Sequence, residues 1–116
     1  MDKRMAYDAT SADDSPTPGY MLAELAKMTL HNYAACKELQ DFLVSRITKS
    51  NHNIKYKCLV IIRHICRKGR GEFKREIGRH IDVIKACLQF TGPPDPLRGD
   101  SIYVRVREAA RETIDA

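Results

Sequence analysis

The residues that could perform catalysis do not form a known catalytic pattern. The sequence contains no phosphate-binding loop, no Gly-x-Ser-x-Gly motif and no His-Glu-x-x-His motif. Asp13 and Asp14 are adjacent acids, but no basic residue lies near them in the sequence. We therefore interpret them as acids that precede a helix rather than as a general acid–base pair. We expect a protein that is not an enzyme.

Histidine and cysteine are present, but their spacing does not suit a metal site. The four histidines share no common spacing, and none of the four cysteines forms a Cys-x-x-Cys pair. The set Cys58, His64 and Cys66 lacks the spacing of a zinc finger. Each cysteine lies among apolar residues, which favours buried free thiols in a reducing compartment. We expect no metal and no cofactor.

Cations are the most conspicuous chemical feature. The net charge is +5, yet the segment from Val44 to His80 holds more than half of the lysines and arginines and only two acids. Such an asymmetry predicts one side that attracts anions, unless the long basic side chains merely solvate outer helix faces. The cluster comprises Lys55, Lys57, Arg63, Arg67, Lys68, Arg70, Lys74, Arg75 and Arg79.

Three classes of ligand compete for this basic segment. Nucleic acid is the least favoured, because Tyr56 and Phe73 are the only aromatic residues nearby and no stacking platform is present. An anionic membrane surface is the second class, since polybasic segments bind such leaflets. A protein partner is the third. Arg46 and Lys57 would converge on an anion if their two helices pack antiparallel.

A proline-rich segment offers a second candidate surface. Gly92 to Gly99 contains three prolines, so it cannot be helical throughout and we expect a rigid, extended loop. It presents Leu97 and Arg98. A preformed loop of this kind loses little entropy on binding a partner.

The element that must position these residues is the segment Lys55 to Lys68. Seven of the nine residues from Cys58 to Cys66 are apolar. A strand is possible, but polar residues at both ends and Gly69 as a stop signal favour a helix. A helix that is apolar nearly all round must be buried on most sides, so other helices should surround it.

The rest of the chain predicts further short helices and no strands. Thr17 and Pro18 are a helix start signal, and Asp100 is expected to cap the last helix. The result is one all-α domain, residues 1–116, of about seven short helices, which we expect to be part of a longer protein with a C-terminal tail. No membrane span or signal peptide is recognised. The other helices are expected at about 2–9, 18–30, 33–48, 72–79, 80–90 and 100–114, with a polar break at 50–53.

Three stretches in order resemble the ENTH domain, the epsin N-terminal homology module: DATSADDSPTPGYMLAELAKMT, YKCLVIIRHICRKG and YVRVREAARETI. The DDSPTPGY loop and GPPDPLRGDSIY are more similar to the tepsin-like branch that accompanies the AP-4 adaptor than to endocytic epsins. This resemblance implies a right-handed superhelix related to VHS domains. It also implies a monomeric cytoplasmic accessory domain, peripheral to trans-Golgi or endosomal membranes, with an adaptor-complex, SNARE or cargo partner.

The same resemblance implies only half of a phosphoinositide pocket. Arg46 and Lys57 match two basic residues of that pocket, and a third basic residue of the pocket falls near Lys49. Ile54 occupies the position of a histidine, Tyr7 that of an arginine, and the membrane-inserting helix of epsins is missing. We therefore expect weak or no specific phosphoinositide binding. The candidate anion contacts are Arg46, Lys49, Lys55 and Lys57, and the candidate protein-binding residues are Arg63, Arg67, Lys68, Pro94, Leu97 and Arg98.

Two alternative functions remain open at this level. A domain that binds the phosphorylated polymerase tail in RNA processing would also be helical and basic. A peripheral phosphoinositide-binding domain would use Arg46 and Lys57 directly.

Overall fold

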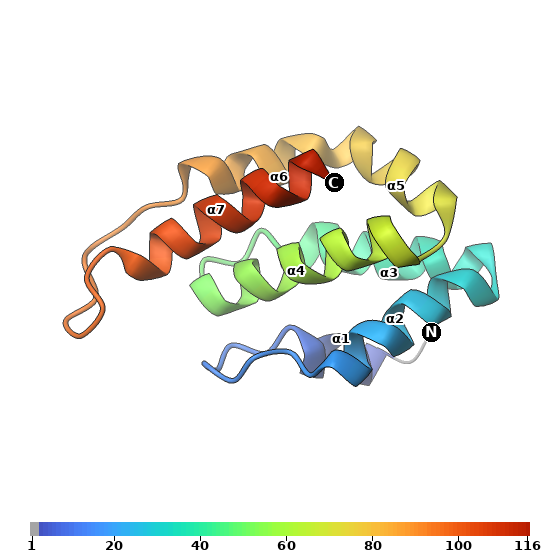
Figure 1. The fold of residues 1–116 in the computed structure, drawn as a ribbon, viewed down its shortest axis with the longest axis horizontal. Helices are drawn as coiled ribbons and strands as arrows, with labels where there is room; N and C mark the ends of the chain where they lie inside the picture. The colour runs from blue at the N-terminus through green and yellow to red at the C-terminus, as the bar shows by residue number, and fades with distance from the viewer. Residues whose placement is uncertain (1–2) are drawn as a thin grey trace.

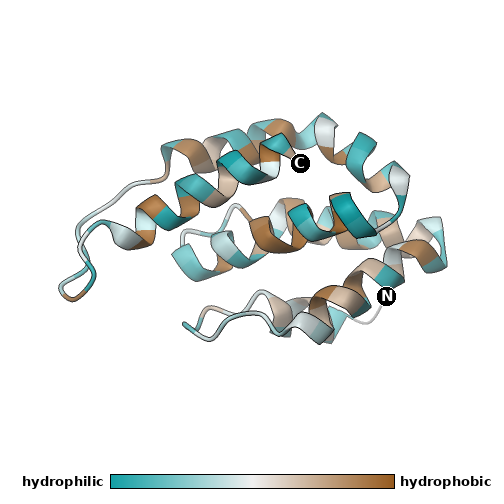
Figure 2. Cartoon of the chain, viewed as in Figure 1, coloured by the Kyte–Doolittle hydropathy of each residue, from teal (hydrophilic) through white to brown (hydrophobic). Residues whose placement is uncertain are grey.

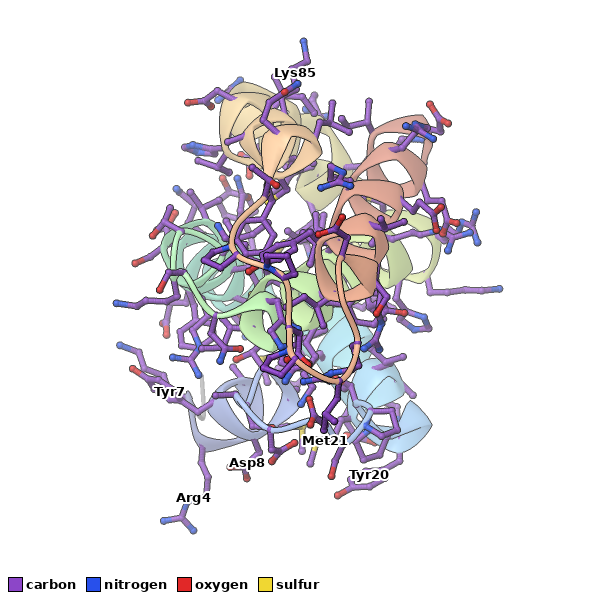
Figure 3. All side chains as sticks on the ribbon, turned by 90° about the vertical axis from the view of Figure 1, so that its left-hand side faces the viewer. Arg4, Tyr7, Asp8, Tyr20, Met21 and Lys85 are labelled. Carbon is purple, nitrogen blue, oxygen red and sulfur yellow. The ribbon has the colours of Figure 1, made fainter. Side chains whose placement is uncertain are left out.

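The computed structural model describes residues 3–116, and these form two layers of helices (Figure 1). Helices α2, α4 and α7 lie side by side in one layer, and α1, α3 and α6 lie behind them, as Figure 3 shows from the end of the molecule. The helices are α1 (Lys3–Ala9), α2 (Gly19–His31), α3 (Tyr33–Arg46), α4 (His52–Lys68), α5 (Gly71–Ile77), α6 (Ile81–Ala86) and α7 (Ser101–Asp115), with 3₁₀ turns at Gly78–His80 and Cys87–Gln89.

Helix α4 is the centre of the domain, as its sequence predicts. It packs against α7, α2, α3 and α5. Asn51 caps its start by accepting hydrogen bonds from the amides of Asn53 and Ile54, and Gly69 ends it. Figure 2 shows the apolar middle of α4 and its hydrophilic last turn. The residues of α4 that are at most 1% exposed are Cys58, Leu59, Ile61, Ile62 and Ile65.

Several helix ends differ from the sequence prediction. Helix α3 stops at Arg46, and the expected helices at 72–79 and 80–90 each finish in a 3₁₀ turn, which is common where a short helix ends. Asp100 makes no capping bond to α7. Thr17 does not cap α2 either: its hydroxyl donates to the carbonyl of Ala9 at 2.7 Å and ties the loop to the end of α1. The predicted helical position Asp2 lies outside the described residues.

The Gly92–Gly99 loop is a built turn rather than a simple extended segment. Asp95 and Gly99 exchange backbone hydrogen bonds of 3.0 and 2.8 Å, and the Asp95 carboxylate accepts from the amides of Leu97 and Arg98. Gly99 has φ +57°, a conformation that favours glycine. The prolines do exclude a helix, but the aspartate and the last glycine close the chain into a hairpin-like turn.

None of the helices in the described range combines the length and apolar composition needed to cross a bilayer.

The core position of α4 predicts that substitutions at neighbouring residues lower the free energy of unfolding by very different amounts. Leu59→Ala should lower the free energy of unfolding by about 2–5 kcal/mol, because Leu59 is fully buried and its removal leaves a cavity. Val60→Ala, on the half-buried outer face of the same helix, should cost about 1 kcal/mol or less. Urea denaturation measures both values, and equal losses would contradict the packing described here.

Candidate functional site

Lys57 is the most constrained cation in the molecule. Its side chain is 5% exposed, and its ammonium group faces the loop between α1 and α2. The Nζ atom donates to the backbone oxygens of Ser11 and Asp13 at 3.0 and 2.9 Å, and it also contacts Ser11 Oγ and Asp13 Oδ1, both at 3.1 Å. An ammonium has three protons, so these partners occupy all of them.

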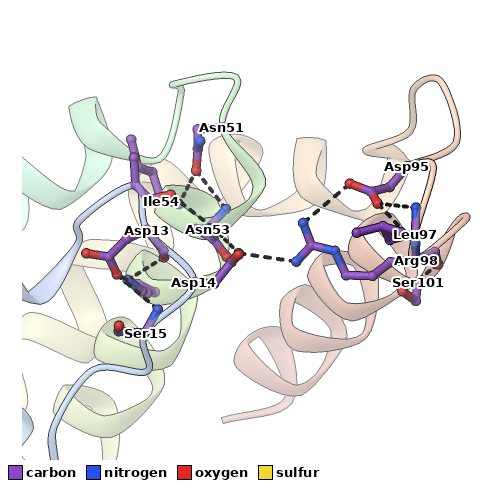
Figure 4. A network of polar contacts seen from close by, with 12 residues as sticks. Asp13, Asp14, Ser15, Asn51, Asn53, Ile54, Asp95, Leu97, Arg98 and Ser101 are labelled. Carbon is purple, nitrogen blue, oxygen red and sulfur yellow. Dashed lines mark hydrogen bonds and ion pairs between the residues drawn. The ribbon is translucent and has the colours of Figure 1, made fainter.

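Asp14 extends the same network to a third part of the chain. Its Oδ1 accepts from Asn53 Nδ2 at 2.9 Å and from Arg98 Nη1 at 3.2 Å (Figure 4). Asn53 Nδ2 also reaches the carbonyl of Ala12, and Arg98 Nη2 pairs with Asp95 at 3.3 Å. We call Asp13, Asp14, Asn53, Lys57 and Arg98 the polar clasp. It joins the 10–18 loop, the start of α4 and the 92–99 turn.

The polar clasp corrects the interpretation of the two acids. Asp13 and Asp14 do not precede a helix, since α2 begins only at Gly19. Their basic partners come from α4 and from the 92–99 turn, 44 and 84 residues away in the chain. The hydrogen bond from Lys57 lowers the pKa of Asp13, and hydrogen bonds from Asn53 and Arg98 lower that of Asp14.

Arg46 binds Thr10, the residue just before the Ser11–Asp13 stretch that Lys57 contacts. Its Nε donates to Thr10 Oγ1 and its Nη2 to the Thr10 carbonyl, both at 3.1 Å. Its guanidinium also lies 5.1 Å from the centre of the Tyr7 ring, which packs edge-on against Phe42. Arg46 and Lys57 therefore both contact the protein's own 10–13 segment, and their convergence on an anion stays a prediction.

The other two candidate anion contacts differ from each other. Lys55 donates to the carbonyl of Ile47 at 2.9 Å and lies over the Phe90 ring, so it points into the fold. Lys49 is exposed, and its side chain makes no hydrogen bond or ion pair within residues 3–116. It lines a hollow of about 500 Å³ between α1 and α3, together with Lys3 and Arg46. Glu38 and Asp41 line the same hollow, and their charge opposes anion binding.

The candidate protein-binding residues form two separate groups. Arg63, Arg67 and Lys68 lie in the C-terminal half of α4, whereas the 92–99 turn lies beyond its N-terminal end (Figure 1). The molecule is 44 Å long, so one small contact cannot cover both groups. Within the turn, Pro94 is exposed, Leu97 is 95% exposed, and Arg98 is engaged in the polar clasp. Arg63 pairs with Glu112 of α7 at 2.8 Å.

The described residues hold no candidate metal cluster of histidine, cysteine or acidic side chains. The cysteines are free, and burial raises the pKa of the Cys58 thiol to about 12. This thiol is therefore a packing group rather than a nucleophile.

Sequence reasoning missed Asn53 and the partners of both acids. The one signal in the sequence that could have pointed to these partners was the pair of acids, Asp13 and Asp14, in a loop without a nearby basic residue. A second missed feature is the stack of the Arg105 guanidinium on the Tyr56 ring, 3.6 Å from its centre, which joins α7 to α4.

The chain matches the model of the ENTH domain over residues 3–116. It is 37% identical over 103 residues to the rat AP-4 complex accessory subunit Tepsin, covering 89% of this chain and 18% of the relative. It is 33% identical over 114 residues to the Arabidopsis thaliana Protein MODIFIED TRANSPORT TO THE VACUOLE 1, covering 97% and 16%. The chain thus spans less than a fifth of the length of these curated relatives.

A solved structure agrees with these matches. The NMR structure of a hypothetical ENTH-VHS domain from Arabidopsis thaliana superimposes with a TM-score of 0.92 at 33% identity. The match covers 98% of this chain and 82% of the other. The predicted all-α, ENTH/VHS-like fold is confirmed.

The hydrogen bonds of Lys57 predict a structural role that can be measured. Lys57→Met keeps much of the side-chain volume but removes the ammonium, so it should lower the free energy of unfolding by about 2 kcal/mol. Lys68→Met, at an exposed position of the same helix, should change it by less than about 0.5 kcal/mol. Urea denaturation of the two variants would contradict the polar clasp if both were as stable as the native chain.

The lowered pKa of Asp13 predicts a pH dependence of stability. A carboxyl whose folded pKa lies below its ordinary value of 3.8 stabilises the fold wherever it is ionised, and this contribution disappears as the pH falls through the folded pKa. Asp13→Asn should therefore lower Tm at pH 7, and its Tm should approach that of the native chain between about pH 5 and pH 2. Circular dichroism melts measure this. Asp115→Asn is the control, and a difference for Asp13→Asn that stays constant down to pH 2 would argue against the ion pair.

Proposed function

Because the chain belongs to the ENTH domain family, we propose that it is a non-enzymatic accessory domain of vesicle-coat trafficking that binds a protein partner and shows weak or no specific phosphoinositide binding. The proposal extends to the whole protein only by similarity. One relative is named as an accessory subunit of the AP-4 complex, and another for transport to the vacuole.

The observation that carries the proposal is the state of Arg46 and Lys57. Both would have to turn towards a phosphate to form an anion pocket, but both are bound to the 10–13 segment. The Lys57 ammonium donates hydrogen bonds to Ser11 and Asp13, and the Arg46 guanidinium donates to Thr10. An incoming phosphate would have to displace these partly buried bonds and approach the carboxylates of Asp13 and Asp14. That exchange costs more than binding to a preformed pocket.

The family similarity also supports a set of finer proposals. We place the protein in the cytoplasm, peripheral to trans-Golgi or endosomal vesicle membranes, as a monomer. Its partner would be an adaptor complex, a SNARE or a cargo protein. The similarity to AP-4 accessory subunits supports the adaptor complex most directly.

Peripheral lipid binding is the second candidate, and one observation favours it. The hollow beside Lys49 carries Lys3 as well, and neither lysine needs to leave a buried bond to meet a headgroup. This arrangement would give binding that depends on surface charge rather than on phosphoinositide stereochemistry.

Vesicle co-sedimentation separates these functions. Vesicles with phosphatidylserine and vesicles with phosphatidylinositol 4,5-bisphosphate, matched in total charge, should pellet the chain to the same small extent at physiological salt. Lys49→Glu should reduce that residual pelleting, whereas Lys85→Glu, an equal charge change at an exposed residue of α6, should have less effect. A strong preference for the phosphoinositide vesicles would overturn the proposed function.

A further inference from the structure

One strip of α4 is left uncovered by the fold. Helices α2 and α7 flank α4 within the same layer, and α3 lies behind it, so no helix covers its outer side (Figure 1). The residues on that side are half-buried or exposed, whereas the inward residues are at most 1% exposed. The strip consists of Tyr56, Val60, Arg63, His64 and Arg67, which we call the α4 strip.

The α4 strip has the spacing of a single helix face. Successive members are four, three, one and three residues apart, so they occupy a sector about 100° wide and about 16 Å long. Towards the N-terminus the polar clasp closes this sector, because Asn53 and Lys57 are buried beneath the 10–14 segment. The open part therefore begins at Tyr56 and runs for about three turns.

The α4 strip is hollowed on both sides. A hollow of about 140 Å³ separates α4 from α7 and is lined by Val60, Arg63 and Ala109 among others. A second hollow, about 160 Å³, separates α4 from α2 and is lined by Leu22, Val60 and His64 among others. Val60 and Arg63 line both hollows, so α4 forms a ridge between two grooves. This relief accepts side chains on either side of a ridge, as in helix–helix packing.

The chemistry of the α4 strip is mixed apolar and cationic. Leu22, Val60 and the Tyr56 ring supply apolar surface, and the Arg105 guanidinium lies over that ring. The side chain of Arg67 makes no hydrogen bond or ion pair among residues 3–116. The strip therefore offers apolar surface and a guanidinium without a partner side by side.

Other occupants fit the α4 strip less well. A bilayer is flat on this scale and cannot fill two grooves on either side of a ridge. Nucleic acid would lay phosphates along the whole strip, including against Glu108 and Glu112 in the groove beside α7, whereas a helix can place apolar side chains in that groove and carboxylates only near Arg67 and Arg105. A helix with carboxylates beside its apolar face matches both the grooves and the cations.

We propose that the α4 strip docks an acidic amphipathic helix of a partner protein. Apolar side chains of that helix fill the two grooves beside Val60, and its carboxylates accept hydrogen bonds from the guanidinium N–H groups of Arg67 and Arg105. The inference rests on the proposed function, since it gives the protein partner a surface and a chemical class. It does not depend on the answer to the lipid question.

The test is an NMR titration of the ¹⁵N-labelled 116-residue chain. The probe is a synthetic helical peptide with leucines on one face and glutamates beside them, and its companion carries lysine at every glutamate position. The acidic peptide should shift the amides of the α4 strip, Leu22 and Arg105, and the basic peptide should not. Shifts that are scattered over the chain, or equal for the two peptides, would overturn the proposal.

Variants then test the site itself. Arg67→Glu should weaken binding of the acidic peptide at least tenfold, and His64→Glu should weaken it as well. Arg75→Glu, an equal charge change at an exposed residue of α5, should leave it unchanged. Thermal melts check that each variant is folded. If Arg67→Glu does not fold, His64→Glu by itself tests the site. Unchanged affinity in the folded variants would overturn the proposal.

Sedimentation equilibrium of the unlabelled chain gives a last independent outcome. A dimer that dissociates in Arg67→Glu would show that the occupant is a second copy of this chain, which would overturn the proposed partner class. The vesicle assay tests the proposed function separately, so the two can fail independently.

Discussion

A single ammonium group, that of Lys57, fixes the N-terminal loop against the central helix. Lys57 lies on the buried core helix, and its charge is compensated only because the 10–13 segment folds over it with two carbonyls, a hydroxyl and a carboxylate. A charge this far from water is unfavourable unless it is fully hydrogen-bonded. The position of the N-terminal loop therefore follows from the need to satisfy Lys57, and Asp14 then anchors Arg98 and the 92–99 turn to the same place.

This constraint also decides what the basic middle of the chain can bind. By composition, Val44 to His80 has the cation excess expected of a phosphate-binding surface. In the folded chain, these cations have different partners. Lys57, Arg46 and Lys55 donate hydrogen bonds to backbone oxygens. Arg63 pairs with Glu112, and the side chains of Lys49 and Arg67 are exposed to solvent. A count of charges overstates the anion-binding capacity, because the charges most deeply placed are structural.

The layered architecture explains why part of the outer face of α4 stays uncovered. A helix in the middle of a two-layer stack is covered behind and on both sides, but its outer face is covered only by flanking side chains. Where those flanking residues are large, the face is closed, and where they are small or turned away, grooves remain. At the N-terminal end of α4 the polar clasp closes the outer face, and beyond Tyr56 it stays open. The same helix thus supplies the core, the clasp and the open strip.

The sequence by itself determined the all-α class, the central position of α4, its stop at Gly69 and the approximate place of every helix, because apolar periodicity and backbone stop signals act over a few residues. Its resemblance to the ENTH family also predicted, through Ile54 and Tyr7, an incomplete phosphoinositide pocket, and this stays a prediction. Only the tertiary structure decided the roles of Asp13, Asp14, Asn53 and Arg98, because their partners lie 39 to 84 residues away in the chain. A pairing over that separation depends on how the helices pack, and no local pattern encodes it.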